Sequence, residues 1–333
     1  MAATENSLKS SANQATTGFL AGNDYVTFHR VSARGCATVG RNRFGRSLTR
    51  HHRRGYNLMN SKKVLLGAAV SAVLLFAAPM ASACALSAWT ATNGTIIAGQ
   101  PNDATPVSRL SGLCAARAAA IGDFVTDASP TGETTYQARF YYYTGNVTGA
   151  RNVFEGRSAA GASNLPIRVQ HNGTSLIFNT NGSATTATAP VSANRWYAVE
   201  LAWAAGAGTG SLAITVTDAG TDTPSFTQTI GSVNNGSDTI EEARLGFISG
   251  TGTGAANFDA FDSRRTTTPG RLCRGDANNS GTRTGADATA VINEFVNGVL
   301  ATGQPDANGN GQVVGSDASS IITAFLNTGS ACP

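Results

Sequence analysis

Two stretches near the C-terminus repeat one residue pattern at a constant offset of 30 positions. The first runs from Asp276 to Phe295 and the second from Asp306 to Phe325. Each opens with Asp-Ala-Asn, has glycine at position 6 and Gly-x-Asp at positions 10 to 12, and then carries a pair of β-branched residues. A repeat this regular indicates a duplicated supersecondary unit. It limits the C-terminal part of the chain to two matched units, each a polar loop that leads into a helix.

The two loops contain the oxygen donors that a calcium ion requires. Ca²⁺ takes about six to eight oxygen ligands, and a 12-residue loop supplies them from positions 1, 3, 5, 7, 9 and 12, with glycine at position 6. The first loop has Asp276, Asn278, Ser280, Thr282, Thr284 and Asp287 at the ligand positions, and the second has Asp306, Asn308, Asn310, Gln312, Val314 and Asp317. The residue at position 7 binds the ion through its backbone carbonyl. Val314 has no side-chain oxygen, so we expect a water molecule to supply the ligand at its position. The sequence thus predicts two Ca²⁺ sites, with a pair of metal-free Asn/Gly turns as the alternative.

Each loop leads into a predicted helix with apolar residues on one side. Asp287 and Asp317 stand where a carboxylate caps a helix N-terminus, and Gly298 and Gly329 stand where the helices should end. The apolar positions are Val291, Ile292, Phe295 and Val299 in the first helix, and Ile321, Ile322, Phe325 and Leu326 in the second. Because neither helix can bury its apolar side alone, we expect the two to pack face to face.

The segment 273–333 resembles the duplicated calcium module of type I dockerins. The resemblance implies a small α-helical calcium-loop domain, and it implies a cohesin-like protein module as a partner, usually one that mounts enzymes on a scaffold. Two features depart from the dockerin pattern. Position 5 is Ser280 or Asn310 where Asp is usual, and positions 10 and 11 lack the Ser-Thr pair that cohesins read.

The first 83 residues have the features of segments that are absent from a mature protein. Residues 1–58 are basic and lack apolar periodicity, so they form either a disordered arm or an extension from a start codon assigned too early. Residues 59–83 contain a short positive region, an apolar run and Ala-Ser-Ala before Cys84, which is the pattern of a secretory signal peptide. We therefore predict a secreted or cell-surface protein that begins at Cys84 and has no transmembrane segment after cleavage.

Charge and cysteines agree with export. Residues 84–333 hold thirteen arginines and eighteen acidic residues, a net charge of −5, which argues against a nucleic-acid partner. Their four cysteines allow three pairings. Pairing within each predicted domain joins Cys84 to Cys114 and Cys273 to Cys332, with an acylated Cys84 as an alternative.

Residues 84–265 predict a β-sandwich. Apolar side chains alternate along 136–143 and 196–203, and Asn172-Gly173 lies between two short strand candidates, which is a strong hairpin signal. Many short strands separated by turns are typical of a sandwich. Residues 266–272 form a linker to the C-terminal domain.

The same stretch resembles the laminin G-like, concanavalin A-like jelly rolls of secreted bacterial proteins. The resemblance rests on four segments, Phe124–Pro130, Ala138–Tyr141, Trp196–Trp203 and Phe258–Arg265. It implies a mainly β jelly-roll domain in an extracellular bacterial protein.

Residues for catalysis are sparse in the predicted sandwich. Glucanases on this fold place three acidic residues alternately on one strand, in the order Glu-x-Asp-x-Glu. This motif is absent from the sequence. Glu133, Glu155 and Glu200 either meet in space or form surface ion pairs with Arg139 or Arg151. His171, beside a tight turn, is predicted to be solvated.

Trp196 and Tyr143 fall opposite the predicted core face, so we expect them to be exposed and able to stack on sugar rings. We accordingly predict a non-catalytic, calcium-binding surface or matrix protein with a polysaccharide as its ligand. A scaffold-docked component that binds a cohesin-like partner is one alternative. An extracellular polysaccharide hydrolase or lyase with a dispersed site is another.

Overall fold

The computed structural model describes residues 84–159 and 164–332. The predicted N-terminal extension (1–58) and signal peptide (59–83) lie outside the described residues. Within the described ranges, no helix is long and apolar enough to cross a membrane.

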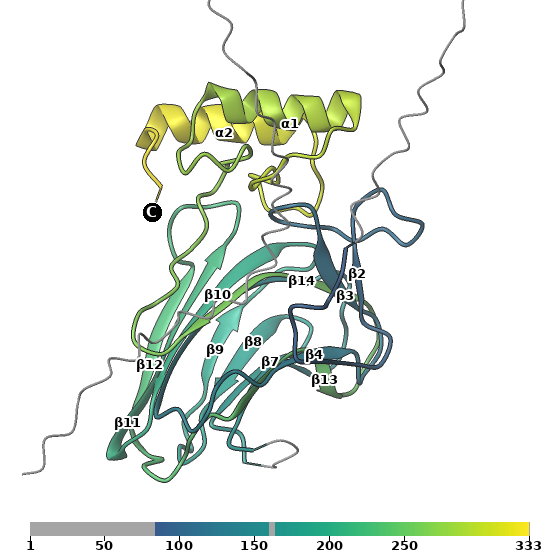
Figure 1. The fold of residues 1–333 in the computed structure, drawn as a ribbon. Helices are drawn as coiled ribbons and strands as arrows, with labels where there is room; N and C mark the ends of the chain where they lie inside the picture. The colour runs from purple at the N-terminus through teal and green to yellow at the C-terminus, as the bar shows by residue number, and fades with distance from the viewer. Residues whose placement is uncertain (1–83, 160–163, 333) are drawn as a thin grey trace, which may run out of the picture. The chain divides into compact units, whose positions relative to one another are not determined.

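Residues 84–265 form a sandwich of two antiparallel sheets with seven strands each (Figure 1). The first sheet has the order β1 (Ala91–Asn93), β4 (Phe124–Asp127), β13 (Glu242–Gly250), β6 (Arg151–Arg157), β7 (Ile167–His171), β8 (Ser175–Asn179) and β9 (Ala187–Pro190). The second sheet has the order β12 (Phe226–Asn234), β11 (Ala207–Asp218), β10 (Trp196–Ala204), β5 (Thr135–Tyr143), β14 (Ala256–Arg264), β3 (Ala115–Ala118) and β2 (Ile97–Gly99). The predicted sandwich is confirmed.

The alternation in β5 and β10 gives the second sheet its core face. The two strands pair antiparallel, with Phe140 opposite Val199. The residues that share the core face are all buried in one cluster: Tyr136, Ala138, Phe140 and Tyr142 on β5, and Tyr197, Val199, Leu201 and Trp203 on β10. Asn172-Gly173 joins β7 to β8 as the hairpin signal predicts.

Two helices follow the linker, α1 (Gly285–Asn297) and α2 (Gly315–Thr328), and they pack side by side (Figure 1). Their shared core is built from Val291, Ile321 and five alanines. The two helices pack against each other as expected, but only part of each apolar side is buried. Successive helix residues point about 100° apart, so burying Val291 turns Ile292 outward, where it is 47% exposed.

Both disulfide pairings are confirmed. Cys84 is bonded to Cys114, with Cα atoms 5.7 Å apart, and Cys273 to Cys332, with Cα atoms 4.9 Å apart. Each bridge lies within one predicted domain. Because the Cys84 sulfur is bonded to Cys114, an acylated Cys84 does not fit the structure.

Candidate metal centre and its contacts with the sandwich

In the first loop, two carboxylates are held by backbone amides. Asp276 accepts hydrogen bonds from the amides of Ser280 and Gly281, each at 2.8 Å. Asp287, the first acidic residue of α1, accepts from the amides at loop positions 3 and 9, at 3.1 and 2.7 Å. The loop therefore wraps around two carboxylates that belong to its two ends.

The second loop repeats this arrangement with the same atoms. Asp306 accepts from the amides of Asn310 and Gly311, at 3.1 and 2.6 Å. Asp317 accepts from the amides at positions 3 and 9, both at 3.0 Å. The sequence repeat is thus matched bond for bond.

These carboxylates are buried without a basic partner. Asp287, Asp306 and Asp317 are fully buried and Asp276 is 7% exposed, and none of the four forms an ion pair among the described residues. Burial, reinforced by the charge of Asp317, raises the pKa of Asp306 to about 7. Burial also raises the pKa of Asp317. Uncompensated buried charge is costly, and a bound cation at each loop would remove that cost.

The remaining predicted ligands supply neutral oxygens near the same positions. The side-chain oxygens of Asn278 and Asn308 accept hydrogen bonds from the backbone amides at position 5 of their loops, both at 3.0 Å. Thr284 donates its hydroxyl to Asp287 at 3.0 Å. The described residues hold no group of three or more His, Cys, Asp or Glu side chains that could bind a metal. A donor set of carboxylate, amide, hydroxyl and carbonyl oxygens fits Ca²⁺ and does not fit metals that prefer nitrogen or sulfur.

The second loop contacts the outer face of the second sheet. The Trp196 amide donates to the Gly309 carbonyl at 2.8 Å, and the Tyr143 hydroxyl donates to the Asn310 carbonyl at 3.3 Å. The rings of Tyr143 and Trp196 lie 5.3 Å apart. A Cβ atom added at Gly311 would lie 2.4 Å from the Tyr143 ring.

These contacts correct the prediction that Trp196 and Tyr143 are exposed for stacking on sugar rings. Trp196 is fully buried and Tyr143 is partly buried. Alternation places them correctly on the outer face of the sheet, but the second loop, more than 100 residues later in the chain, covers that part of the face. Their role here is to hold the loop.

Ion pairs and the linker strengthen the same contact. Arg109, from a sandwich loop, pairs with Glu294 of α1 at 2.5 Å, and both side chains are buried. Asp222 pairs with Arg283 at 3.1 Å. The linker amide of Leu272 donates to the Tyr141 hydroxyl at 2.9 Å. The segment with the two loops is thereby joined to the sandwich by ion pairs as well as by hydrogen bonds.

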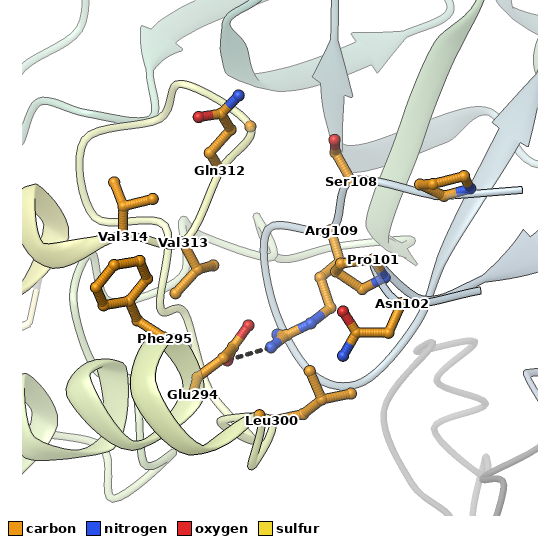
Figure 2. A pocket seen from close by; sticks show the side chains of 13 residues that line it. Pro101, Asn102, Ser108, Arg109, Glu294, Phe295, Leu300, Gln312, Val313 and Val314 are labelled. Carbon is orange, nitrogen blue, oxygen red and sulfur yellow. Dashed lines mark hydrogen bonds and ion pairs between the residues drawn. The ribbon is translucent and has the colours of Figure 1, made fainter. Parts of the chain in front are cut away.

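A cavity of about 470 Å³ lies beside the buried ion pair. Figure 2 shows Arg109 and Glu294 pointing toward each other, with Phe295, Leu300 and Val314 of the second loop among the residues that line the cavity. The lining is largely apolar apart from this pair and a few amide and hydroxyl groups. Sequence reasoning missed the Arg109–Glu294 pair, because its partners are 185 residues apart and neither belongs to a recognisable motif.

The three glutamates considered for catalysis do not meet. Glu155 lies on β6 of the first sheet and Glu200 on β10 of the second. Glu155 pairs with Arg157 at 2.5 Å and Glu133 with Arg265 at 2.9 Å, so the expected partners Arg139 and Arg151 are wrong for both.

Glu200 is half-buried, and its burial raises its pKa despite the charges of Arg271 and Arg139. His171 is also misplaced by the sequence prediction, since it is 1% exposed and shares a hydrogen bond of 2.8 Å with the Tyr142 hydroxyl. Burial, with the charge of Arg151, lowers the pKa of His171 to about 4.

A row of polar side chains crosses the outer face of the first sheet. Arg244 on β13 lies opposite Glu155 on β6, Glu155 opposite Arg168 on β7, and Arg168 opposite Asn179 on β8. Next to this row, Gln170 donates to Asn152 at 3.2 Å. The strand register that aligns these residues is not visible in the sequence.

No protein-family model matches the chain, and no curated protein matches it. Among solved structures, "Cellulose induced protein, Cip1" is 13% identical over 55% of this chain and 92% of that one, with a TM-score of 0.37. The "botulinum neurotoxin serotype D binding domain" is 9% identical over 52% of this chain and 43% of that one, with a TM-score of 0.36. The likeness covers about half of the chain, and at these scores it carries no argument about function.

Proposed function

We propose that the chain is an exported, non-catalytic protein whose two C-terminal loops bind Ca²⁺, and that calcium in the second loop secures the helical module on the sandwich. The observation that carries the proposal is the pair of buried carboxylates in each loop, held by amides and left without a basic partner. The signal peptide predicted at residues 59–83 and the two disulfides support export. N-terminal sequencing of exported material should begin at Cys84, and recovery of residues 1–58 would refute the processing.

Within each site, the residues have distinct roles. Asp276 and Asp287, or Asp306 and Asp317, would supply the charge, and the neutral oxygens at positions 3, 5 and 7 would complete the shell, with Thr284 adding one in the first loop. Bound calcium neutralises the buried carboxylates. Because position 5 lacks a carboxylate, we expect weak binding, with a Kd of roughly 10⁻⁴ to 10⁻³ M.

The second loop couples its metal to the sandwich. Its carbonyls at Gly309 and Asn310 accept hydrogen bonds from Trp196 and Tyr143, so the loop must keep one backbone shape for these bonds to form. Repulsion between the unneutralised Asp306 and Asp317 opposes that shape. Calcium removal is therefore expected to weaken the contact with the sandwich.

Calorimetric titration and thermal melting of the chain from Cys84, with its disulfides intact, test the proposal. At about 10 mM Ca²⁺ a Kd in the range above adds about 1.4 to 2.7 kcal/mol of stability for each site. Asp317→Asn should abolish one of two binding events, whereas Glu241→Gln, on the sandwich and outside both loops, should leave both. No heat of binding and a melt unchanged by chelator would refute calcium binding.

Polysaccharide binding is a second candidate function. The observation that favours it is the polar row on the first sheet, where Arg168, Gln170 and Asn179 are partly exposed and can bond to sugar hydroxyls. A polysaccharide array tests it, with Gln170→Ala expected to weaken binding and Thr227→Ala, on an edge strand of the other sheet, as the control. A reducing-sugar assay should show no turnover, and released sugar would contradict the non-catalytic assignment.

Neither polysaccharide cleavage nor docking to a cohesin-like scaffold gains support from these residues. A hydrolase or lyase needs two carboxylates near the scissile bond. Among the described residues, Glu133, Glu155 and Glu200 lie apart and do not form such a pair. The dockerin positions read by cohesins hold Gly-Ala at 285–286 and Gly-Ser at 315–316, and no observation favours a cohesin-like partner.

A further inference from the structure

Most of the large exposed apolar side chains gather on the two helices. Among the described residues seven large hydrophobic side chains are exposed, and only Ile121 lies outside the C-terminal module. The other six define what we call the apolar helix face: Ile292, Phe295 and Val296 on α1, Val299 just after its end, and Ile322 and Leu326 on α2. Phe295, at the edge of this face, also lines the cavity beside the Arg109–Glu294 pair. Their exposed fractions run from 39% for Ile322 to 75% for Leu326. A patch of this kind on an exported protein indicates an interaction surface.

The apolar helix face carries no charge. Between positions 283 and 332 the ionisable side chains are those of Arg283, Asp287, Glu294, Asp306 and Asp317, and all five are buried. The exposed residues beside the apolar ones are small and neutral, such as Ser319 and Thr323. A partner that recognises charge would find no ion-pair partner on this surface.

We propose that the apolar helix face binds the same face of a second copy of the chain, forming a symmetric homodimer. A two-fold interface places one patch against itself, so any charge on it would meet the same sign in the partner. A face without charge avoids that repulsion. The sequence repeat also places exposed residues at equivalent positions of the two helices, Ile292 with Ile322 and Val296 with Leu326.

The size of the face predicts weak association. A 13-residue helix is about 20 Å long and about 10 Å wide, so two side by side present on the order of 400 Å² in projection. Pairing two such faces would bury on the order of 800 Å² in total, which is below the roughly 1,200 Å² of a stable interface and in the range of weak, transient ones. We therefore expect a dimer with a dissociation constant in the micromolar range that is insensitive to salt, because no ion pairs contribute.

Sedimentation velocity of the chain from Cys84, in calcium at about 1 to 500 μM protein and at two salt concentrations, tests the inference. The wild type should shift from monomer to dimer with concentration. Val296→Glu with Leu326→Glu should weaken association at least tenfold, and Ile121→Glu on the sandwich should not. Far-ultraviolet circular dichroism melting checks that the variants remain folded, and the milder Val299→Ser with Leu326→Ser should weaken association in the same direction.

Two results would overturn the homodimer. A wild type that stays monomeric at every concentration would show that the apolar helix face does not bind a second copy, and a different protein would then be its partner. A dimer that survives both double substitutions would place the contact elsewhere. The measurement is independent of calcium affinity, since a chain that binds no calcium can still be tested for self-association while its helices are folded.

Discussion

Replacing Gly311 with alanine should destabilise the protein more than the same change at Gly281. Both glycines occupy position 6 of a loop and have nearly the same positive φ, 83° and 84°. An alanine in this region costs roughly 1–2 kcal/mol. At Gly281 nothing lies within 4 Å of the added Cβ, whereas at Gly311 the added atom meets the Tyr143 ring at 2.4 Å.

The difference between the two variants isolates the contact with the sandwich. Overpacking against a held ring adds roughly 1–3 kcal/mol, so Gly311→Ala should lose about 2–5 kcal/mol and Gly281→Ala about 1–2 kcal/mol. Urea unfolding of the chain from Cys84, in saturating calcium, gives both values. Equal losses for the two variants would refute the reasoning, because they would mean that the second loop does not press on Tyr143.

Three further predictions follow from buried groups. Because the pKa of His171 is lowered in the folded chain, the unfolded chain takes up a proton on this residue at a higher pH than the folded chain does. The free energy of unfolding should therefore fall by about 3 kcal/mol as pH drops from 6.5 to about 4. Urea unfolding in saturating calcium should show this pH dependence in the wild type and not in His171→Gln. Glu294→Gln leaves Arg109 buried without its charge partner and should cost about 3–5 kcal/mol, as measured by denaturant unfolding; a smaller loss with Arg109→Met added would confirm that the charge is the cause. Removing the Cys273–Cys332 bridge, whose cysteines are separated by 59 positions, should cost roughly 4 kcal/mol in the same assay; unchanged stability would contradict its structural role.

Local patterns in the sequence predict much of this structure. The 30-residue offset gives both loops, both helices and the paired carboxylates, because each loop closes on bonds within about 12 residues of sequence. Alternation in β5 and β10 gives the core face, since side chains on a strand point to opposite sides in turn. The disulfides follow from the division into domains.

What the sequence missed depends on contacts between distant segments. Alternation tells which side of the sheet Trp196 faces, but not that a loop from another part of the chain covers that side. The pair of Glu155 and Arg157 is an exception, since these residues are two positions apart on β6 and the sequence does not show which arginine Glu155 pairs with. Helix spacing identifies Phe295 as apolar, but only the packing of small alanines in the helix pair decides that it remains exposed.

Hydrogen exchange at the Trp196 amide tests the central claim most directly. This amide donates to the Gly309 carbonyl of the second loop, so its protection reports whether the loop contacts the sandwich. We predict strong protection in calcium and a large loss of protection in chelator, while the amide of Val199 in the core of the same sheet stays protected in both. Equal protection of Trp196 with and without calcium would contradict the claim that calcium secures the helical module.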